Sequence, residues 1–182
     1  KHPEVVSVTL VEIDPAVVEV SNRFLPGLTT GFTDPRTRII HDDGTSYLQD
    51  KINVYDVIIV DGPDPVGPAR NLLSSLSLER ASRALRGPGI FSAQTESLHF
   101  HKDSVVAVQK KLMELFPIVD LYTQSIATYA GNWWTFSIGS MQVRLRLPTR
   151  RIQIPTRYYS AEVHRKAFFP RDLYRELING LL

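Results

Sequence analysis

Residues 55–69 read YDVIIVDGPDPVGPA, and this stretch decides the fold class expected for the chain. Its four apolar β-branched residues, Val57 to Val60, are too few for a helix and are bounded by turn formers. Such a run predicts a strand buried on both faces, as in a parallel sheet covered by helices. Ligands bind outside the carboxyl ends of the strands in such sheets, so Asp61 and Asp64 follow the strand where chemistry is expected. The plainer alternative is that both aspartates only stabilise turns in a proline-rich loop.

The rest of the chain alternates strand and helix patterns. Further strands are expected over residues 7–13, 36–41, 89–94, 118–126 and 133–140. Helix patterns start at Asp14-Pro15, include residues 47–48 and 78–85, start again at Asp103 and Ser160, and close the chain over residues 171–182. In the first helix Val17, Val20 and Phe24 recur at helical spacing. This order predicts an α/β fold with a Rossmann-like, methyltransferase-type sheet rather than a dinucleotide dehydrogenase.

Two further acidic positions lie at the ends of predicted strands. Glu12 ends the first strand, where nucleotide-binding units place a carboxylate that accepts hydrogen bonds from both ribose hydroxyls. Asp42 and Asp43 precede Gly44 at the end of the second strand, and an adenine amino group is a donor that would suit one of them. The alternative for Glu12 is a helix N-terminal charge favoured by the helix dipole. We expect Glu12, Asp43 and Asp61 to share the carboxyl edge of one sheet.

Composition describes an ordinary globular protein, with 182 residues of which 43% are hydrophobic and 22% charged. No apolar run is long enough to cross a bilayer and no signal peptide is recognisable, so a cytoplasmic location and no membrane partner are expected. Residues 141–182 hold nine Lys or Arg against three acids, but these bases are scattered, so no nucleic acid is expected. No cysteine is present, and His99 and His101 lack a third ligand at a suitable spacing, so no metal is expected.

The organisation expected is a Rossmann-like catalytic domain over residues 1–141, followed by a connector and helices over residues 142–182 that pack on the same domain. No glycine-rich GxGxxG run is present, although a nucleotide-binding domain opens with one. We therefore expect the domain to be incomplete at its N-terminus, without its first strand.

Two segments carry a resemblance to a known family. Residues 61–69, DGPDPVGPA, resemble the signature loop of the spermidine synthases, the polyamine aminopropyltransferases, usually written DSSDPxGPA. Gly62 and Pro63 stand where that pattern has serines. Residues 158–168, YYSAEVHRKAF, resemble the C-terminal YYNxxVHxxAF segment of the same family. The resemblance runs along nearly the whole chain, and it implies that a glycine-rich GGGDG motif and a small N-terminal β-domain would precede Lys1.

The resemblance also implies roles for individual residues. Asp61 matches the proposed general base. The residues implied at the nucleoside are Glu12, Asp43, Gly44 and Pro68, and those implied at the amine are Asp64, Gln94 and Tyr129. Glu96, in the same QxE segment as Gln94, is a weaker candidate for the amine. After Tyr129 the sequence reads AGN where the family has PSG, so the shape of that loop departs from the family pattern.

The reaction implied is transfer of the aminopropyl group of decarboxylated S-adenosylmethionine, a co-substrate, to putrescine, giving spermidine and methylthioadenosine without a cofactor. The sequence leaves agmatine, cadaverine and spermidine open as acceptors. A homodimer or homotetramer is implied for the complete protein. Two alternatives stay open: a catalytically inert fragment, and an S-adenosylmethionine-dependent methyltransferase on the same fold. The paired acids Asp61 and Asp64 favour a polyamine acceptor over methyl transfer.

Overall fold

The computed structural model describes residues 2–62, 71–129 and 133–182. Its contacts divide the chain into two compact units, Lys1–Asp50 and Lys51–Leu182, and each is described by itself. The domain organisation expected from the sequence stays a prediction. Among the described residues, none of the helices has the length and apolarity required to cross a membrane.

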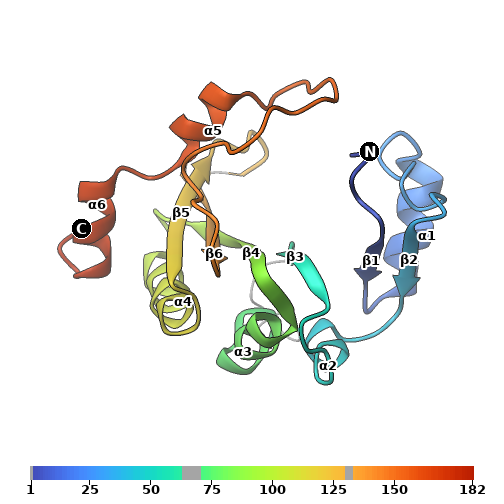
Figure 1. Cartoon of the computed structure of the whole chain (residues 1–182), viewed down its shortest axis with the longest axis horizontal. Helices are drawn as coiled ribbons and strands as arrows, with labels where there is room; N and C mark the ends of the chain where they lie inside the picture. The colour runs from blue at the N-terminus through green and yellow to red at the C-terminus, as the bar shows by residue number, and fades with distance from the viewer. Residues whose placement is uncertain (1, 63–70, 130–132) are drawn as a thin grey trace. The chain divides into compact units, whose positions relative to one another are not determined.

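The first unit is a two-stranded parallel sheet with two helices (Figure 1). β1 (Val8–Val11) pairs in parallel with β2 (Thr37–Ile40), in the register Val8↔Thr37 to Val11↔Ile40. α1 (Pro15–Phe24) starts as predicted, because Asp14 accepts a hydrogen bond from the Ala16 amide at 2.9 Å and Pro15 occupies the first turn. α2 (Gly44–Tyr47) is a single turn that follows β2.

The apolar face of α1 is not buried. Val17, Val20 and Phe24 are all exposed, and no residue of the helix is buried. A two-stranded sheet has too little surface to enclose a helix face, so helical periodicity here predicts the helix but not its burial. Polar interactions stabilise the start of this unit. The Arg36 guanidinium binds both carboxylate oxygens of Asp34 and donates to the carbonyl oxygens of His2 and Val5.

The second unit is built on a four-stranded mixed sheet in the order β3-β4-β6-β5 (Figure 1). Its strands are β3 (Tyr55–Val60), β4 (Leu85–Ser97), β5 (Ile118–Gln124) and β6 (Trp134–Ser140). β3 and β4 are parallel, whereas β6 runs antiparallel to both β4 and β5. Its helices are α3 (Ser75–Ala84), α4 (Lys102–Leu115), α5 (Ala161–Ala167) and α6 (Arg171–Ile178). The expected alternation of strands and helices, closing with two adjacent strands, is confirmed.

β3 corrects the prediction of a strand buried on both faces. Val57 is 52% exposed and Ile59 is 73% exposed, while Ile58 and Val60 on the other face are partly buried. β3 is an edge strand of its sheet, and helices α3 and α4 pack chiefly over the other strands. The strand itself was predicted correctly, but a run of four apolar residues does not report how many faces the fold covers.

Two element boundaries differ from the sequence-based predictions. Leu85 was assigned to the helix before Gly87-Pro88, yet α3 ends at Ala84 and Leu85 opens β4 in an extended conformation. Gly and Pro interrupt a helix but fit an extended chain, and the β3–β4 register shifts between Tyr55 and Val57 to take up the extra residues. Asp103 was expected to cap α4, but it lies in the first turn, while His101 holds the cap position without a side-chain hydrogen bond. Ser160 caps α5 as predicted, accepting from the Val163 amide at 3.1 Å.

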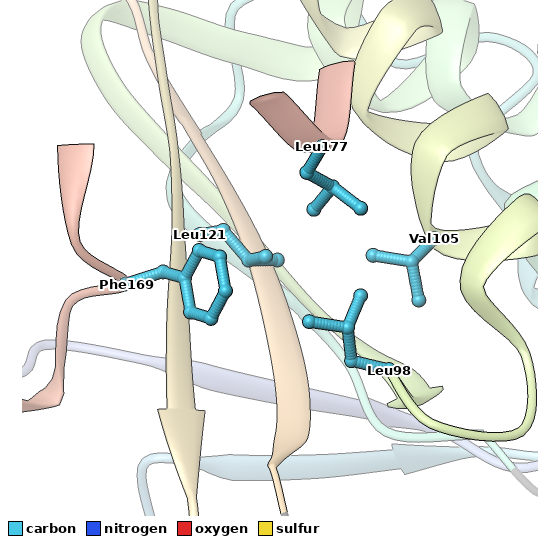
Figure 2. Packing of buried hydrophobic residues seen from close by; sticks show 5 residues of the cluster. All are labelled: Leu98, Val105, Leu121, Phe169 and Leu177. Carbon is cyan, nitrogen blue, oxygen red and sulfur yellow. The ribbon is translucent and has the colours of Figure 1, made fainter. Parts of the chain in front are cut away.

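The core of the second unit lies between the sheet and α4. Leu98, Val105, Leu121, Phe169 and Leu177 form one buried cluster, and Figure 2 shows their side chains pointing toward one another from the end of β4, α4, β5 and the C-terminal segment. The C-terminal segment reaches this cluster by running beside β5, where the Phe169 amide donates to the Leu121 carbonyl at 2.9 Å. Residues after 142 are thus part of the second unit's core.

Candidate functional site

In the first unit, Glu12 and Asp43 lie at the same edge of the sheet. β1 and β2 are parallel and end together at the pair Val11↔Ile40, and the Glu12 amide donates to the Ile40 carbonyl at 3.0 Å. Asp43 follows β2 after two residues and caps α2. The two carboxylates proposed for the nucleoside are therefore brought to one strand edge by strand pairing. Asp61 follows β3 of the separate four-stranded sheet, so the expectation that all three acids share one sheet is wrong.

Both carboxylates already make local hydrogen bonds. Glu12 Oε1 accepts from the Asp14 amide at 2.9 Å, and Asp43 Oδ1 accepts from the Ser46 amide at 2.7 Å. For Glu12 this is a local contact at a helix N-terminus, the place that its plainer alternative gave it, and for Asp43 it is a helix cap. Each uses one of two oxygens, so capping fixes the direction of the carboxylate and the other oxygen remains for a ligand. Gly44 opens α2 directly after Asp43, which places a helix N-terminus beside that carboxylate.

In the second unit, the corresponding edge carries Asp61 and Gln94. Asp61 directly follows β3, and the pairing Val60↔Ala93 puts it level with Gln94 on the neighbouring parallel strand. Asp61 is exposed, so its carboxylate is accessible from solvent. Asp64 and Pro68 lie outside the described residues, so their predicted roles stay predictions.

β4 carries a bulge immediately beyond Gln94. The β4–β6 pairing passes from Gln94↔Phe136 to Ser97↔Trp134, which leaves one extra residue on β4. Glu96 sits in this bulge with a left-handed φ of 74°, and it is 5% exposed. A non-glycine residue in this conformation is unusual, and bulges of this kind re-aim side chains near active sites.

The bulge orients two polar side chains. The Glu96 amide donates to Gln94 Oε1 at 3.1 Å, so the Gln94 side chain is turned back along the strand. Glu96 Oε2 lies 3.6 Å from His101 Nδ1 at the start of α4. The structure thus holds a carboxyl group at the strand end, and a carboxyl group can accept hydrogen bonds from an amine. The sequence ranked Glu96 below Gln94, because only the structure shows the bulge that encloses it.

Tyr129 lies at the same edge through the loop between β5 and β6. Its ring stacks on Trp134 with centroids 4.3 Å apart, and Trp134 pairs with Ser97 at the end of β4. The ring of Tyr129 is 52% exposed, so one aromatic face is fixed and the side chain still reaches solvent. The second unit therefore gathers Asp61, Gln94, Glu96 and Tyr129 along one edge.

Two other features of the described residues lie apart from the predicted site. They contain no group of three or more His, Asp or Glu side chains arranged to hold a metal ion. A cavity of about 530 Å³ lies on the sheet face opposite α4, with Tyr122, Phe136, His164 and Phe168 among its lining. Burial raises the pKa of the Tyr122 hydroxyl there, and none of the predicted site residues that the structure describes lines this cavity.

Comparison with known proteins identifies the family. A family model described as the spermine/spermidine synthase domain matches residues 1–147. Polyamine aminopropyltransferase 1 of Aquifex aeolicus (strain VF5) is 47% identical over 180 residues, covering 99% of this chain and 64% of that protein. The polyamine aminopropyltransferase of Bacillus subtilis (strain 168) is 40% identical over 180 residues, covering 98% of this chain and 65% of that protein.

Solved structures agree with the α/β fold predicted from the sequence. A spermidine synthase in complex with the transition-state analogue AdoDATO matches with a TM-score of 0.89 and 27% identity, covering 100% of this chain and 64% of that one. The spermidine synthase from Thermotoga maritima matches with a TM-score of 0.86 and 26% identity, covering 100% of this chain and 62% of that one. The chain spans just under two thirds of the length of these relatives. A family model over residues 1–147 and the matching fold confirm the resemblance: the chain belongs to the spermine/spermidine synthase family.

Proposed function

We propose that this chain carries the catalytic residues of an aminopropyltransferase that moves the aminopropyl group of decarboxylated S-adenosylmethionine to a diamine, with putrescine as the leading acceptor. The observation that carries the proposal is the edge of the second unit. There strand pairing aligns Asp61 with Gln94, and the buried Glu96 and the stacked Tyr129 lie at the same strand ends. A carboxylate, an amide, a second carboxylate and an aromatic face are the groups that a diammonium ligand needs.

The chemistry assigns one proton transfer to the protein. A primary amine attacks the carbon attached to the sulfonium, the new C–N bond forms as the C–S bond breaks, and methylthioadenosine leaves as a neutral thioether. The leaving group therefore needs no acid. The amine, with an ordinary pKa of about 10.4, is almost entirely protonated near neutral pH and must lose a proton before it can attack. Asp61 is the group proposed to take that proton, because it is exposed at the edge where the amine would bind.

The other residues position the two substrates. In the first unit, the oxygens of Glu12 and Asp43 not used in local caps would accept hydrogen bonds from the ribose hydroxyls and the adenine amino group. In the second unit, Glu96 and Gln94 would hold the amine, and Tyr129 would offer its ring face to a cationic end. Holding both reactants in line supplies much of the acceleration in such transfers. Asp64 and Pro68 keep the roles that the family resemblance implies.

Asp61→Asn tests the assignment of the base, with Asp56→Asn as the matched control. Asparagine keeps the shape of Asp61 but cannot take a proton, so turnover should fall by about 10²–10⁴-fold, the usual contribution of a general base. Methylthioadenosine binding, measured by calorimetry, should stay within about twofold. Asp56 lies on the same strand and pairs with Arg86 at 2.7 Å, so its replacement should leave turnover nearly unchanged. Retention of more than about a tenth of the turnover in Asp61→Asn would rule Asp61 out as the base.

Ligand binding by the unmodified chain separates this proposal from its alternatives. Calorimetry should detect methylthioadenosine and, in its presence, putrescine. An inert chain would bind neither ligand. A methyltransferase would bind the methylated cofactor S-adenosylmethionine and its product but show no saturable site for a diamine.

A further inference from the structure

A line of polar side chains crosses the core of the second unit. It starts on the C-terminal helix α6, passes through α4 and β6 to β4, and ends at the bulge beside the proposed amine site. We call it the relay, and its members in order are Tyr174, Gln109, Ser137, Thr95 and Thr135. The four inner members are buried, with Gln109, Ser137 and Thr135 fully enclosed.

Each step of the relay is a hydrogen bond of ordinary length. The Tyr174 hydroxyl donates to Gln109 Oε1 at 2.6 Å, and Gln109 Nε2 donates to Ser137 Oγ at 2.7 Å. Thr95 Oγ1 lies 3.0 Å from both Ser137 Oγ and Thr135 Oγ1. The Thr135 hydroxyl then donates to the Glu96 carbonyl at 2.8 Å. A continuous path therefore joins a side chain on α6 to a single backbone carbonyl on β4.

Counting protons fixes the direction of the two ambiguous bonds. A hydroxyl has one proton to donate, and Thr135 uses its proton on the Glu96 carbonyl. Thr95 must therefore donate its only hydroxyl proton to Thr135, so it can only accept a hydrogen bond from Ser137. Ser137 must then donate to Thr95, and this agrees with the amide of Gln109 donating to Ser137. Every bond points from α6 toward Glu96, an arrangement in which successive bonds polarise and strengthen one another.

The relay ends on the one peptide that the bulge most needs to hold. Glu96 has a left-handed φ of 74°, which is costly for a residue with a side chain. Its carbonyl is held by Thr135, and its amide is held by the side chain of Gln94 at 3.1 Å. Holding the two peptide groups that flank the Cα of Glu96 sets the direction in which the carboxylate of Glu96 and the amide of Gln94 point.

A purely structural core would not require these polar groups. Burying a hydroxyl costs free energy unless it is hydrogen-bonded, and replacing bonded polar pairs by apolar groups of the same shape is often nearly neutral. Thr95 and Thr135 have the shape of valine and face the same core as Phe91 and Leu121. Unlike valine, these threonines offer directional hydrogen bonds. Such bonds can hold the backbone of Glu96 in its strained left-handed conformation.

We propose that the relay is a positioning device that couples the C-terminal helix α6 to the amine site, by holding the Glu96 peptide and with it the side chains that receive the amine. The amine part of this inference rests on the function proposed above. Relay members touch no substrate, so they are positioning residues rather than catalytic ones. Helix α6, which packs on α4 and contributes Leu177 to the buried cluster, thereby gains a role in amine binding.

The test uses three threonine variants of the chain. Thr135→Val removes the last donor and keeps the shape, Thr135→Ser keeps the hydroxyl, and Thr123→Val is the matched control on β5, whose hydroxyl makes a 3.5 Å bond to the Ala167 carbonyl outside the relay. The first readout is carbon-13 NMR of the Glu96 carbonyl. Loss of its hydrogen bond in Thr135→Val should shift that signal upfield, while Thr135→Ser and Thr123→Val should leave it in place. An unshifted Glu96 carbonyl in Thr135→Val would overturn the relay.

The second readout is putrescine affinity in the presence of methylthioadenosine. Thr135→Val should weaken putrescine about tenfold, the usual worth of a buried hydrogen bond, with methylthioadenosine binding unchanged and Thr135→Ser restoring most of the loss. Equal losses for Thr135→Val and Thr123→Val would mean a general effect on the sheet and would contradict positioning. If the unmodified chain binds no putrescine, the proposed function fails, and the Glu96 carbonyl alone decides whether the relay exists.

Tyr174→Phe tests the relay from its distant end and covers the case in which Thr135→Val does not fold. Removing one partly exposed hydroxyl leaves the packing of α6 in place, so the fold should survive. We expect the Glu96 carbonyl to shift in the same direction as in Thr135→Val by a smaller amount, and putrescine affinity to fall about threefold. No change in either quantity would show that coupling stops before α6.

Discussion

Each of the two compact units of this chain is stabilised internally by a different kind of interaction. In the second unit, the buried apolar side chains run from Leu78 to Leu177 and form a core between the sheet and α4. In the first unit, the only described residues classed as buried are Thr29 and Thr45, and apolar residues such as Leu28 stand exposed. The first unit is ordered by caps and by the Arg36 contacts to Asp34 and to two backbone carbonyls, whereas the second is ordered by packing.

This difference bears on the proposed division of labour. The nucleoside candidates lie in the unit with little core, and their carboxylates are directed by local caps one to three residues away. The amine candidates lie in the packed unit, where Glu96 is directed by side chains far away in the sequence. A ligand that binds the first unit would add stability where packing adds little.

The largest expected contrast is between two Leu→Ala substitutions. Leu121 is fully buried in the cluster of Figure 2, so Leu121→Ala should lower the free energy of unfolding by about 2–5 kcal/mol. Leu28 is 81% exposed, and Leu28→Ala should change it by no more than about 0.5 kcal/mol. Urea unfolding of both variants measures the difference. Similar losses would mean that the apolar residues of the first unit are buried in solution.

A second contrast concerns space rather than burial, and it uses two glycines of the same sheet. A Cβ at Gly139 would lie 2.7 Å from the Phe116 ring, whereas a Cβ at Gly87 would lie 3.6 Å from the nearest atom, on Gln142. Phe116 is itself buried and stacked against Phe91, so it has no room to move. Gly139→Ala should cost about 1–3 kcal/mol of stability, and Gly87→Ala should stay within about 0.5 kcal/mol. Thermal unfolding monitored by circular dichroism would compare them, and equal midpoints would show that the sheet is looser than its packing implies.

Local sequence signals predicted what local forces determine. The Asp14-Pro15 and Ser160 caps, the strand before Asp61 and the strand–helix alternation all depend on neighbours a few residues apart, and all are present. Both faces of β3 were predicted as buried, but Val57 and Ile59 are exposed, because burial depends on what covers an element and a run of apolar residues does not report it.

The candidate site shows the same limit. Asp61 was found because it follows a predicted strand, and Gln94 was found through the family resemblance, but the relay joins residues 28 to 65 positions apart. In β6 the alternation of apolar and polar residues predicts the wrong face as the core. Its apolar residues Phe136 and Ile138 line the cavity on the other face, while Thr135 and Ser137 face the core. An alternating pattern predicts the opposite assignment, so only coordinates reveal the buried hydroxyls.

We expect the loss of stability at high pH to arise in the second unit. Burial, reinforced by the negative charge of Asp120, raises the pKa of the Tyr174 hydroxyl above its ordinary value of 10.0. A raised pKa means that the folded state holds the proton more tightly than the unfolded state. The contribution of this tyrosine is therefore complete below about pH 10 and is lost as pH rises above it. Denaturant unfolding at rising pH should show a steeper loss for the unmodified chain than for Tyr174→Phe, and parallel curves would contradict the assignment.

We expect the smallest of these effects to be a loss of stability at low pH, and we expect it to arise in the first unit. Two hydrogen bonds from the Arg36 side chain and backbone hold the pKa of the Asp34 carboxyl well below its usual range. A lowered pKa means that the folded state favours the charged carboxylate, so the contribution is complete above about pH 4 and is lost as pH falls below it. The pair is exposed to solvent, so salt should weaken it further. Proton NMR of the Arg36 side chain, titrated downward in pH, should show its hydrogen bonds to Asp34 breaking at a pH well below that at which the exposed carboxyls titrate.

The control is Asp34→Asn, in which the Arg36 signals should have the positions of the broken bonds at every pH, while the amide signals of α4 and β6 stay unaffected. If instead Asp34 titrates together with the exposed carboxyls, the contacts from Arg36 to the backbone at His2 and Val5 alone order the start of the chain, and the first unit depends even less on charge than its structure implies.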